Sequence, residues 1–111
     1  SEDRMIYFPS HSTALADSEK EKLHVVYADY LKQNPKKAVA LIGRSDDLGS
    51  RSYNLAIAEE RTSVTRDLLR LYGVAPRQIR CYSIGNEKKP TACRSKECKQ
   101  RMRRVEVVIV P

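Results

Sequence analysis

The amino-acid sequence predicts an α/β sandwich of the α+β class, in which helices pack on one mixed sheet in the order strand, helix, strand, helix, strand, strand. Residues 38–42 form a nearly continuous apolar run that ends at Gly43, as expected of a buried central strand. Residues 18–34 and 52–72 instead repeat apolar residues at helical spacing. A chain of 111 residues buries one modest core, so we expect residues 1–111 to form a single domain.

Boundary residues mark the first strand and the first helix. Residues 5–8 form a short β-type run that Pro9 ends. Ser18, followed by Glu21 three residues later, has the pattern of a capping box at the start of a helix. Asn34-Pro35 ends this helix. Its apolar positions follow one helical stripe: Leu23, Val26, Tyr27, Tyr30 and Leu31.

The second half of the chain predicts a strand–helix–strand unit and a final strand. The helix over residues 52–72 ends at Gly73, a typical C-terminal signal, and residues 79–84 form the next strand. Because a helical crossover favours a parallel pair, we expect strands 38–42 and 79–84 to run parallel. A long basic loop then leads to the strand at residues 105–110, which can add antiparallel.

The net charge of +7 indicates a polyanionic partner, which is either nucleic acid or a carboxylate-rich cell wall. The positive charge peaks between Lys88 and Arg104, where a merely solvated surface is the alternative interpretation. This basic segment lacks interleaved aromatic residues, so we expect no nucleic-acid binding. No apolar run reaches the length of a membrane span, and Ser1 begins no signal-peptide pattern. Any membrane attachment is therefore expected through a segment outside this sequence.

Three cysteines bear on the cellular compartment. Cys93 and Cys98 are close enough to close a small disulfide loop, which would stabilise the fold by about 2 kcal/mol and imply an oxidising compartment. Cys81 lies in an alternating segment and is predicted to be a small buried residue. No second close ligand pair accompanies His11 or His24, so we expect no metal site. We also expect no cofactor and no catalysis, because no nucleophile and base are brought together.

Arg61 is the residue that does not fit an ordinary helix. The apolar stripe of the second helix contains Ile57, Val64 and Leu68, and Arg61 occupies the position between the first two. An arginine that faces a core needs an anionic partner. Two structural alternatives are that its stem reaches back to water or that it forms an internal salt bridge.

The functional alternative is an anion from outside the protein. The loop before this helix contains Ser45, Asp46 and Asp47, and Asn54 follows near the helix start. An acid and an arginine placed together can bind a zwitterion, since the acid holds an ammonium and the guanidinium fork holds a carboxylate.

The segment from Gly43 to Arg61 resembles the signature of the OmpA-like C-terminal domain, a family that includes peptidoglycan-associated lipoproteins and flagellar stator proteins. The specific feature is the spacing of Tyr53-Asn54 and Arg61 after an Asp-x-x-Gly loop. Further similarities occur at Gly73-Val74, at Gly85 with Pro90, in the opening residues 6–15, and at Arg103-Arg104-Val105-Glu106. The resemblance covers essentially the whole chain.

The resemblance implies non-covalent binding of the peptidoglycan stem peptide through its meso-diaminopimelate residue. Asp46 would bind the ammonium of that residue and Arg61 its carboxylate. The same pocket would be lined by Asn54, Ser45, Ser12, Thr13 and one of Arg103 and Arg104. The family also implies a periplasmic location, with a tether to the outer membrane of a Gram-negative bacterium, and it accounts for a Cys93–Cys98 disulfide.

Three positions depart from the family's usual pattern: His11 where an acid is common, Arg44 where His is usual before the hydroxyl residue, and Met102 where Asn is usual. These changes make the edge of the pocket more basic. They leave open an alternative function, in which the domain is a protein–protein adaptor of a secretion or motility machine in the envelope and its wall-binding pocket is weakened.

Overall fold

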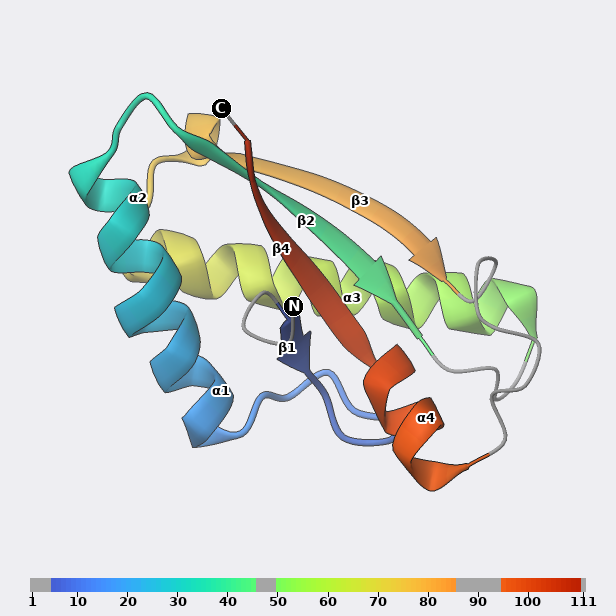
Figure 1. Cartoon of the computed structure of the whole chain (residues 1–111). Helices are drawn as coiled ribbons and strands as arrows, with labels where there is room; N and C mark the ends of the chain where they lie inside the picture. Colours follow the sequence, from blue (N-terminus) through green and yellow to red (C-terminus); the bar gives the residue numbers. More distant parts are fainter. Residues whose placement is uncertain (1–4, 46–49, 86–94, 111) are drawn as a thin grey trace.

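The computed structural model describes residues 5–45, 50–85 and 95–110. Four strands form one mixed sheet in the order β1-β4-β2-β3: β1 (Met5–Tyr7), β2 (Ala38–Arg44), β3 (Ile79–Gly85) and β4 (Arg104–Val110). As predicted, β2 and β3 pair parallel, and β4 pairs antiparallel with β2 and with β1. The predicted class, helices packed on a mixed sheet, is confirmed (Figure 1).

The helices bury one face of this sheet. In Figure 1, α3 (Arg51–Leu71) lies behind the long strands, and the first helical segment lies beside them. The core between these layers is apolar. It contains residues of β1, β2, β4 and the helices: Ile6, Leu23, Leu31, Val39, Leu41, Leu69, Val105 and Val107. The near-continuous apolar run of β2 therefore lies where the sequence predicted, in the middle of the fold.

The first helical segment differs from the prediction at its start and on its surface. It consists of α1 (Asp17–Lys22), a π-helical turn η2 (Leu23–Ala28) and α2 (Asp29–Gln33). Its N-cap is Ala16, without a side-chain cap, so the capping box predicted at Ser18 is wrong. The wider π turn places residues four or five apart on one face. Leu23, Tyr27 and Ala28 are consequently buried, whereas Val26 and Tyr30, expected on the buried stripe, are exposed.

The C-terminus of α3 follows the sequence signal, whereas its N-terminal cap, Ser50, was not predicted. The Ser50 hydroxyl accepts a hydrogen bond from the Tyr53 amide (3.1 Å) and caps the N-terminus. At the other end Gly73 takes a left-handed φ of 101°, and Val74 donates to the carbonyl of Leu69 (3.0 Å). This is the Schellman termination that a C-terminal glycine predicts.

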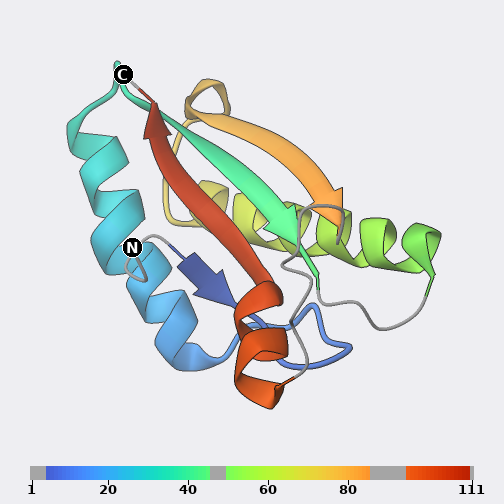
Figure 2. The same cartoon turned by 45° about the vertical axis from the view of Figure 1, so that its right-hand side comes forward.

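Two short helical elements were not predicted. The segment expected as one long basic loop contains α4 (Lys96–Met102), capped by the Ser95 hydroxyl, which accepts from the Cys98 amide (3.0 Å). Figure 2 shows α4 at the end of the sheet where β4 begins. A short 3-10 turn, η3 (Pro76–Gln78), precedes β3. α4 has only seven residues, most of them charged or polar, and Met102 alone is buried, so the pattern is too weak for sequence periodicity to identify this helix.

The packing of α3 on β2 depends on Gly43. A Cβ at this position would lie 2.1 Å from Thr62 Oγ1 and 2.4 Å from the Ala58 carbonyl oxygen. The buried face of α3 consists of polar residues, one alanine and one leucine: Asn54, Ala58, Arg61, Thr62, Thr65 and Leu69. The Thr62 and Thr65 hydroxyls donate to carbonyls four residues earlier, both at 2.8 Å, so neither is left without a partner.

We predict that Gly43→Ala lowers the free energy of unfolding by about 1–3 kcal/mol, because the added methyl group meets helix backbone that cannot move independently. Urea denaturation followed by circular dichroism measures this change. Ser52→Thr adds one methyl group at an exposed position of α3 and serves as the matched control, expected within about 0.5 kcal/mol of the wild type. Equal stability of both variants would contradict the close helix–strand contact.

Candidate functional site

Arg61 is one of the largest fully buried side chains of the described residues, with 1% of its surface exposed. Its Nε donates to the Ser12 carbonyl oxygen (3.1 Å), and Nη2 donates to the Pro9 carbonyl oxygen (3.2 Å). The guanidinium carbon lies 5.3 Å from the centre of the Phe8 ring. The alternative in which the stem of Arg61 reaches back to water is therefore wrong.

These contacts favour arginine specifically. Hydrogen bonds to a charged group contribute about 1.5–3 kcal/mol each, and a desolvated cation over an aromatic ring adds roughly 2 kcal/mol. The planar fork reaches two carbonyls in different directions, which a lysine ammonium on a single flexible stem cannot reproduce. The salt-bridge alternative involves Asp46 and Asp47, which lie outside the described residues.

The loop that Arg61 holds has a defined shape. Ser12 donates its amide to the Pro9 carbonyl (3.2 Å), and the Ser12 hydroxyl accepts from the Ala14 amide (3.0 Å). His11 takes a left-handed φ of 53°, and its Nδ1 lies 3.1 Å from the Tyr53 hydroxyl at the start of α3. The loop is thus fixed to α3 at two places, by Arg61 and by Tyr53. The sequence did not identify Tyr53 as a residue that contacts this loop.

Two other predicted site residues are buried near the junction of β2 and α3. Ser45 directly follows β2 and is 1% exposed, and Asn54 in the first turns of α3 is fully buried. Asn54 and Arg61 are seven residues apart, so they share one face of the helix, about 10 Å apart along its axis. Asp46 lies outside the described residues. Thr13 is partly buried beside Ser12.

The structure separates the two tandem arginines. Arg103 Nε donates to the Phe8 carbonyl (3.2 Å), beside the ring that Arg61 covers. Arg104 turns instead to Glu106, with Nη2 2.6 Å from Oε2, and to the Arg101 carbonyl at 2.9 Å. Only Arg103 therefore lies with Arg61 around the opening loop.

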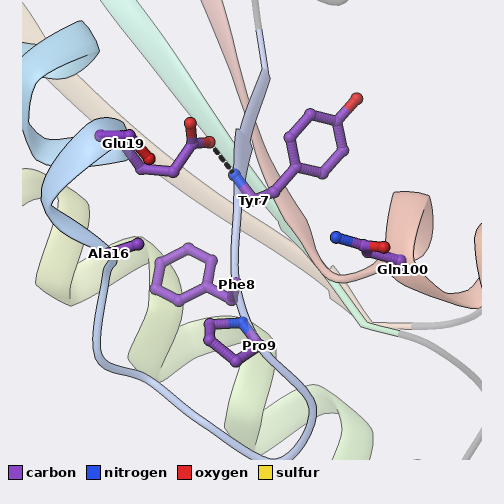
Figure 3. A pocket seen from close by; sticks show the side chains of 7 residues that line it. Tyr7, Phe8, Pro9, Ala16, Glu19 and Gln100 are labelled. Carbon is purple, nitrogen blue, oxygen red and sulfur yellow. Dashed lines mark hydrogen bonds between the residues drawn. The ribbon is translucent and has the colours of Figure 1, made fainter.

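A hollow of about 370 Å³ lies between β1, the start of α1 and α4 (Figure 3). It is lined by Tyr7, Phe8, Pro9, Ala16, Ser18, Glu19 and Gln100. The Glu19 carboxylate accepts from the Tyr7 amide at 2.7 Å and is 3.3 Å from Lys22 Nζ. Glu19 thus occupies an outward amide of the edge strand β1, a device that hinders the addition of another strand.

A model of the OmpA family matches residues 7–103. Peptidoglycan-associated lipoprotein of Brucella melitensis is 31% identical over 107 residues, which are 96% of this chain. The chain belongs to the OmpA family. It spans 62% of the length of the Brucella relative, and 46% of a Legionella pneumophila peptidoglycan-associated lipoprotein that is 37% identical over 81 residues.

Solved structures of the family agree with the fold. The crystal structure of the peptidoglycan-associated lipoprotein from Burkholderia pseudomallei superposes with a TM-score of 0.90 at 30% identity, covering 96% of this chain and 90% of that one. The C-terminal domain of Helicobacter pylori MotB gives 0.86 at 22% identity, covering 96% and 84%. OmpA-family domains bind without catalysis, so the prediction of a non-catalytic module is confirmed.

The three departures from the usual OmpA-family pattern have different structural roles. His11 contacts Tyr53, as described above. Arg44 Nε lies 2.6 Å from Glu106 Oε2, the oxygen that Arg104 also contacts, so its charge faces an internal carboxylate. Met102 is 5% exposed, and its sulfur lies 3.4 Å from Arg104 Nη1. Arg44 and Met102 thus belong to a packed cluster at the start of β4.

The cysteines and metal-binding side chains are partly described. Cys81 is exposed, so its predicted burial is wrong; β3 is an edge strand, and α3 covers it incompletely. The pKa of the Cys81 thiol is nevertheless raised above its ordinary value. Partial burial is the main cause; the positive charge of Arg66 opposes the shift, and the negative charge of Asp67 adds to it. Cys93 lies outside the described residues.

In the described part of the chain no three His, Cys, Asp or Glu side chains cluster as metal ligands, and no helix is long and apolar enough to span a membrane.

We predict that Arg61→Lys lowers the unfolding free energy by about 1–3 kcal/mol, because Lys keeps the charge but loses one of the two carbonyl contacts. Thermal denaturation at neutral pH measures the loss. The control is Arg66→Lys on the exposed part of the same helix, where the ion pair with Asp67 is a surface contact. A loss in the control as large as that in Arg61→Lys would refute the role assigned to the fork.

For the cysteines we predict one alkylated thiol, Cys81, when the protein is unfolded without reductant, and three when reductant is added first. A Cys93–Cys98 bond protects the other two thiols in the first case. Intact-mass spectrometry counts the labels, and a Cys81→Ser variant, expected to take none without reductant, is the control. Three labels on oxidatively prepared, unreduced protein would contradict the disulfide.

Proposed function

We propose that this chain is a peptidoglycan-binding module whose ligand site is organised by Arg61. One observation carries the proposal: the guanidinium is buried and bonded to the 9–12 loop in a chain of the OmpA family. Relatives about 31% identical are named peptidoglycan-associated lipoproteins, which supports the wall as ligand. A buried arginine whose fork is already oriented loses little entropy when it binds a carboxylate.

The ligand chemistry follows from the groups around this position. The meso-diaminopimelate residue of the stem peptide carries an ammonium and a carboxylate on one carbon. Arg61 would bind the carboxylate in a bidentate manner, and Asp46, just before α3, would bind the ammonium.

The remaining lining residues are Ser12, Thr13, Ser45, Asn54 and Arg103. Arg103 is preferred to Arg104, since Arg103 contacts the Phe8 carbonyl next to Arg61, whereas Arg104 pairs with Glu106. Ser12 contributes its carbonyl and fixes the loop through its hydroxyl. These residues shape the pocket around the two charged contacts.

The proposed location is the periplasm of a Gram-negative bacterium. The named relatives are lipoproteins, so a tether to the outer membrane through a segment outside this sequence is part of the proposal. A Cys93–Cys98 bond would form in this oxidising compartment. Residues 1–111 would then act as one wall-anchoring domain of a longer envelope protein.

The test is co-sedimentation of the 111-residue protein with purified sacculi. We predict that Asp46→Ala and Arg61→Ala each reduce the bound fraction at least about tenfold, as expected when a charged contact is lost. Asp67→Ala removes an exposed acid from α3 and is the matched control, expected to bind like the wild type. Asp46→Asn replaces only the carboxylate by an amide of similar size, so its result does not depend on the folding of the Arg61 variant.

Undiminished binding of Asp46→Asn and a folded Arg61 variant would remove the proposed site. Absence of binding by the wild-type protein would instead favour the adaptor function, in which His11 at the loop reflects a weakened pocket. Circular dichroism of each variant distinguishes loss of binding from loss of fold.

A further inference from the structure

A second hollow, of about 530 Å³, lies where β2 and β3 begin. Its lining residues are Pro35, Lys36, Lys37, Ala38, Arg77, Gln78 and Arg80. Four of these seven carry a positive charge and none carries a negative one. We call these four side chains the cationic cluster. In the sequence it is separate from the basic stretch between Lys88 and Arg104.

The backbone beneath the cationic cluster is fixed by one buried amide. Gln78 is 3% exposed, and its Nε2 donates to three carbonyls, those of Leu31 (2.8 Å), Asn34 (3.1 Å) and Lys37 (3.0 Å). Gln78 Oε1 accepts from the Ala75 amide at 3.3 Å. The end of α2, the turn into β2 and η3 are thereby joined, so the four cations project from a preformed support.

The turn itself is also constrained. Lys37 donates its amide to the Asn34 carbonyl at 2.9 Å, which closes a four-residue turn with Pro35 at its second position. Proline fixes φ there and restricts Asn34. Lys36 and Lys37 are therefore presented by a rigid turn, which lowers the entropy lost when a ligand is bound.

The charges of the cationic cluster lack internal compensation. Across residues 5–45, 50–85 and 95–110 none of the four forms an ion pair, whereas other basic side chains do: Lys22, Lys32, Arg44, Arg66 and Arg104. A concave surface lined by one sign of charge focuses the electrostatic potential and concentrates counter-ions. The hollow therefore has the properties of an anion site.

This hollow is distinct from the Arg61 site. Ala38 begins β2 and Ser45 follows its last residue, so the hollow and Ser45 are separated by the strand's seven residues, roughly 20 Å. In both views the turn into β2 and the start of β3 lie near the C-terminal end of β4, away from α4 (Figures 1 and 2). A ligand in the hollow therefore need not compete with one at Arg61.

We propose that the cationic cluster binds a compact, multiply charged anion that carries phosphate groups. Arg77 and Arg80 supply planar forks that match phosphate oxygens, and Lys36 and Lys37 supply point charges. Four cations match a diphosphate or a phosphate ester better than a single carboxylate. The phosphate is carried either by a small soluble molecule or by the headgroup of an anionic phospholipid. This inference does not depend on peptidoglycan binding.

The first experiment is a titration of the ¹⁵N-labelled 111-residue protein with sodium diphosphate at constant ionic strength, set with sodium chloride. The amides of residues 36–38 and 77–80 are expected to shift and saturate, whereas those of residues 50–62 do not. The double variant Lys36→Gln/Arg77→Gln, exposed at both positions, should weaken binding about tenfold or more. Arg66→Gln, which removes a paired surface arginine, should leave it unchanged.

The second experiment identifies the source of the phosphate. Vesicles of phosphatidylglycerol with phosphatidylcholine are compared with pure phosphatidylcholine vesicles in a flotation assay. If the wild-type protein floats with the anionic vesicles and the double variant does not, the ligand is a phospholipid headgroup. If the wild-type protein responds to diphosphate but does not float, the ligand is a soluble molecule. Both results support the site. Shifts spread over all basic segments, or a double variant that binds diphosphate like the wild type, would overturn the proposal. Sacculus binding of the double variant should remain that of the wild type.

Discussion

The buried guanidinium of Arg61 connects the helix, the opening loop and the proposed ligand site. Its Nε and Nη2 donate hydrogen bonds to the carbonyls of Ser12 and Pro9, and its guanidinium lies over the Phe8 ring. A cation in this position is stable because the loop supplies oriented dipoles and an aromatic face in place of water. The loop, in turn, has its shape because Arg61 holds it. Fold stability and the proposed ligand recognition therefore share one side chain.

This arrangement requires α3 to lie unusually close to the sheet. Gly43 leaves room for the Ala58 carbonyl and the Thr62 side chain, and Thr62 turns its hydroxyl back to the helix. The close approach places the next residue of that face, Arg61, at a depth where it reaches the 9–12 loop. At the opposite end of β2, Gln78 gives a comparable support to the cationic cluster. One strand thus links two polar sites through its two ends.

The sequence allowed most of the fold and the unusual position of Arg61 to be predicted, for identifiable reasons. The apolar run of β2 and the glycine that ends α3 are strong local signals, and a lone arginine on an apolar stripe can be noticed from spacing alone. The π turn η2 could not be predicted, because it alters which residues face the core without a clear sequence mark. Cys81 was misjudged, since alternation does not reveal that its strand lies at a sheet edge.

The tandem arginines illustrate a different limit. The resemblance implies that one of Arg103 and Arg104 lines the pocket but does not say which. Only tertiary contacts separate Arg103, beside Phe8, from Arg104, which pairs with Glu106. The cationic cluster was equally hidden. Its members come from two segments about 40 residues apart, residues 36–37 and 77–80, joined by the amide of Gln78.

The most direct test of the central claim is nitrogen-15 NMR of the arginine side chains during titration with a diaminopimelate-containing stem peptide. The account predicts that the Arg61 Nε–H is slow to exchange before the peptide is added, because it donates to the Ser12 carbonyl. It also predicts that the Arg61 signal shifts and saturates with the peptide while that of exposed Arg66 stays unchanged. An Arg61 signal that exchanges rapidly and does not respond to a peptide that the protein binds would contradict it.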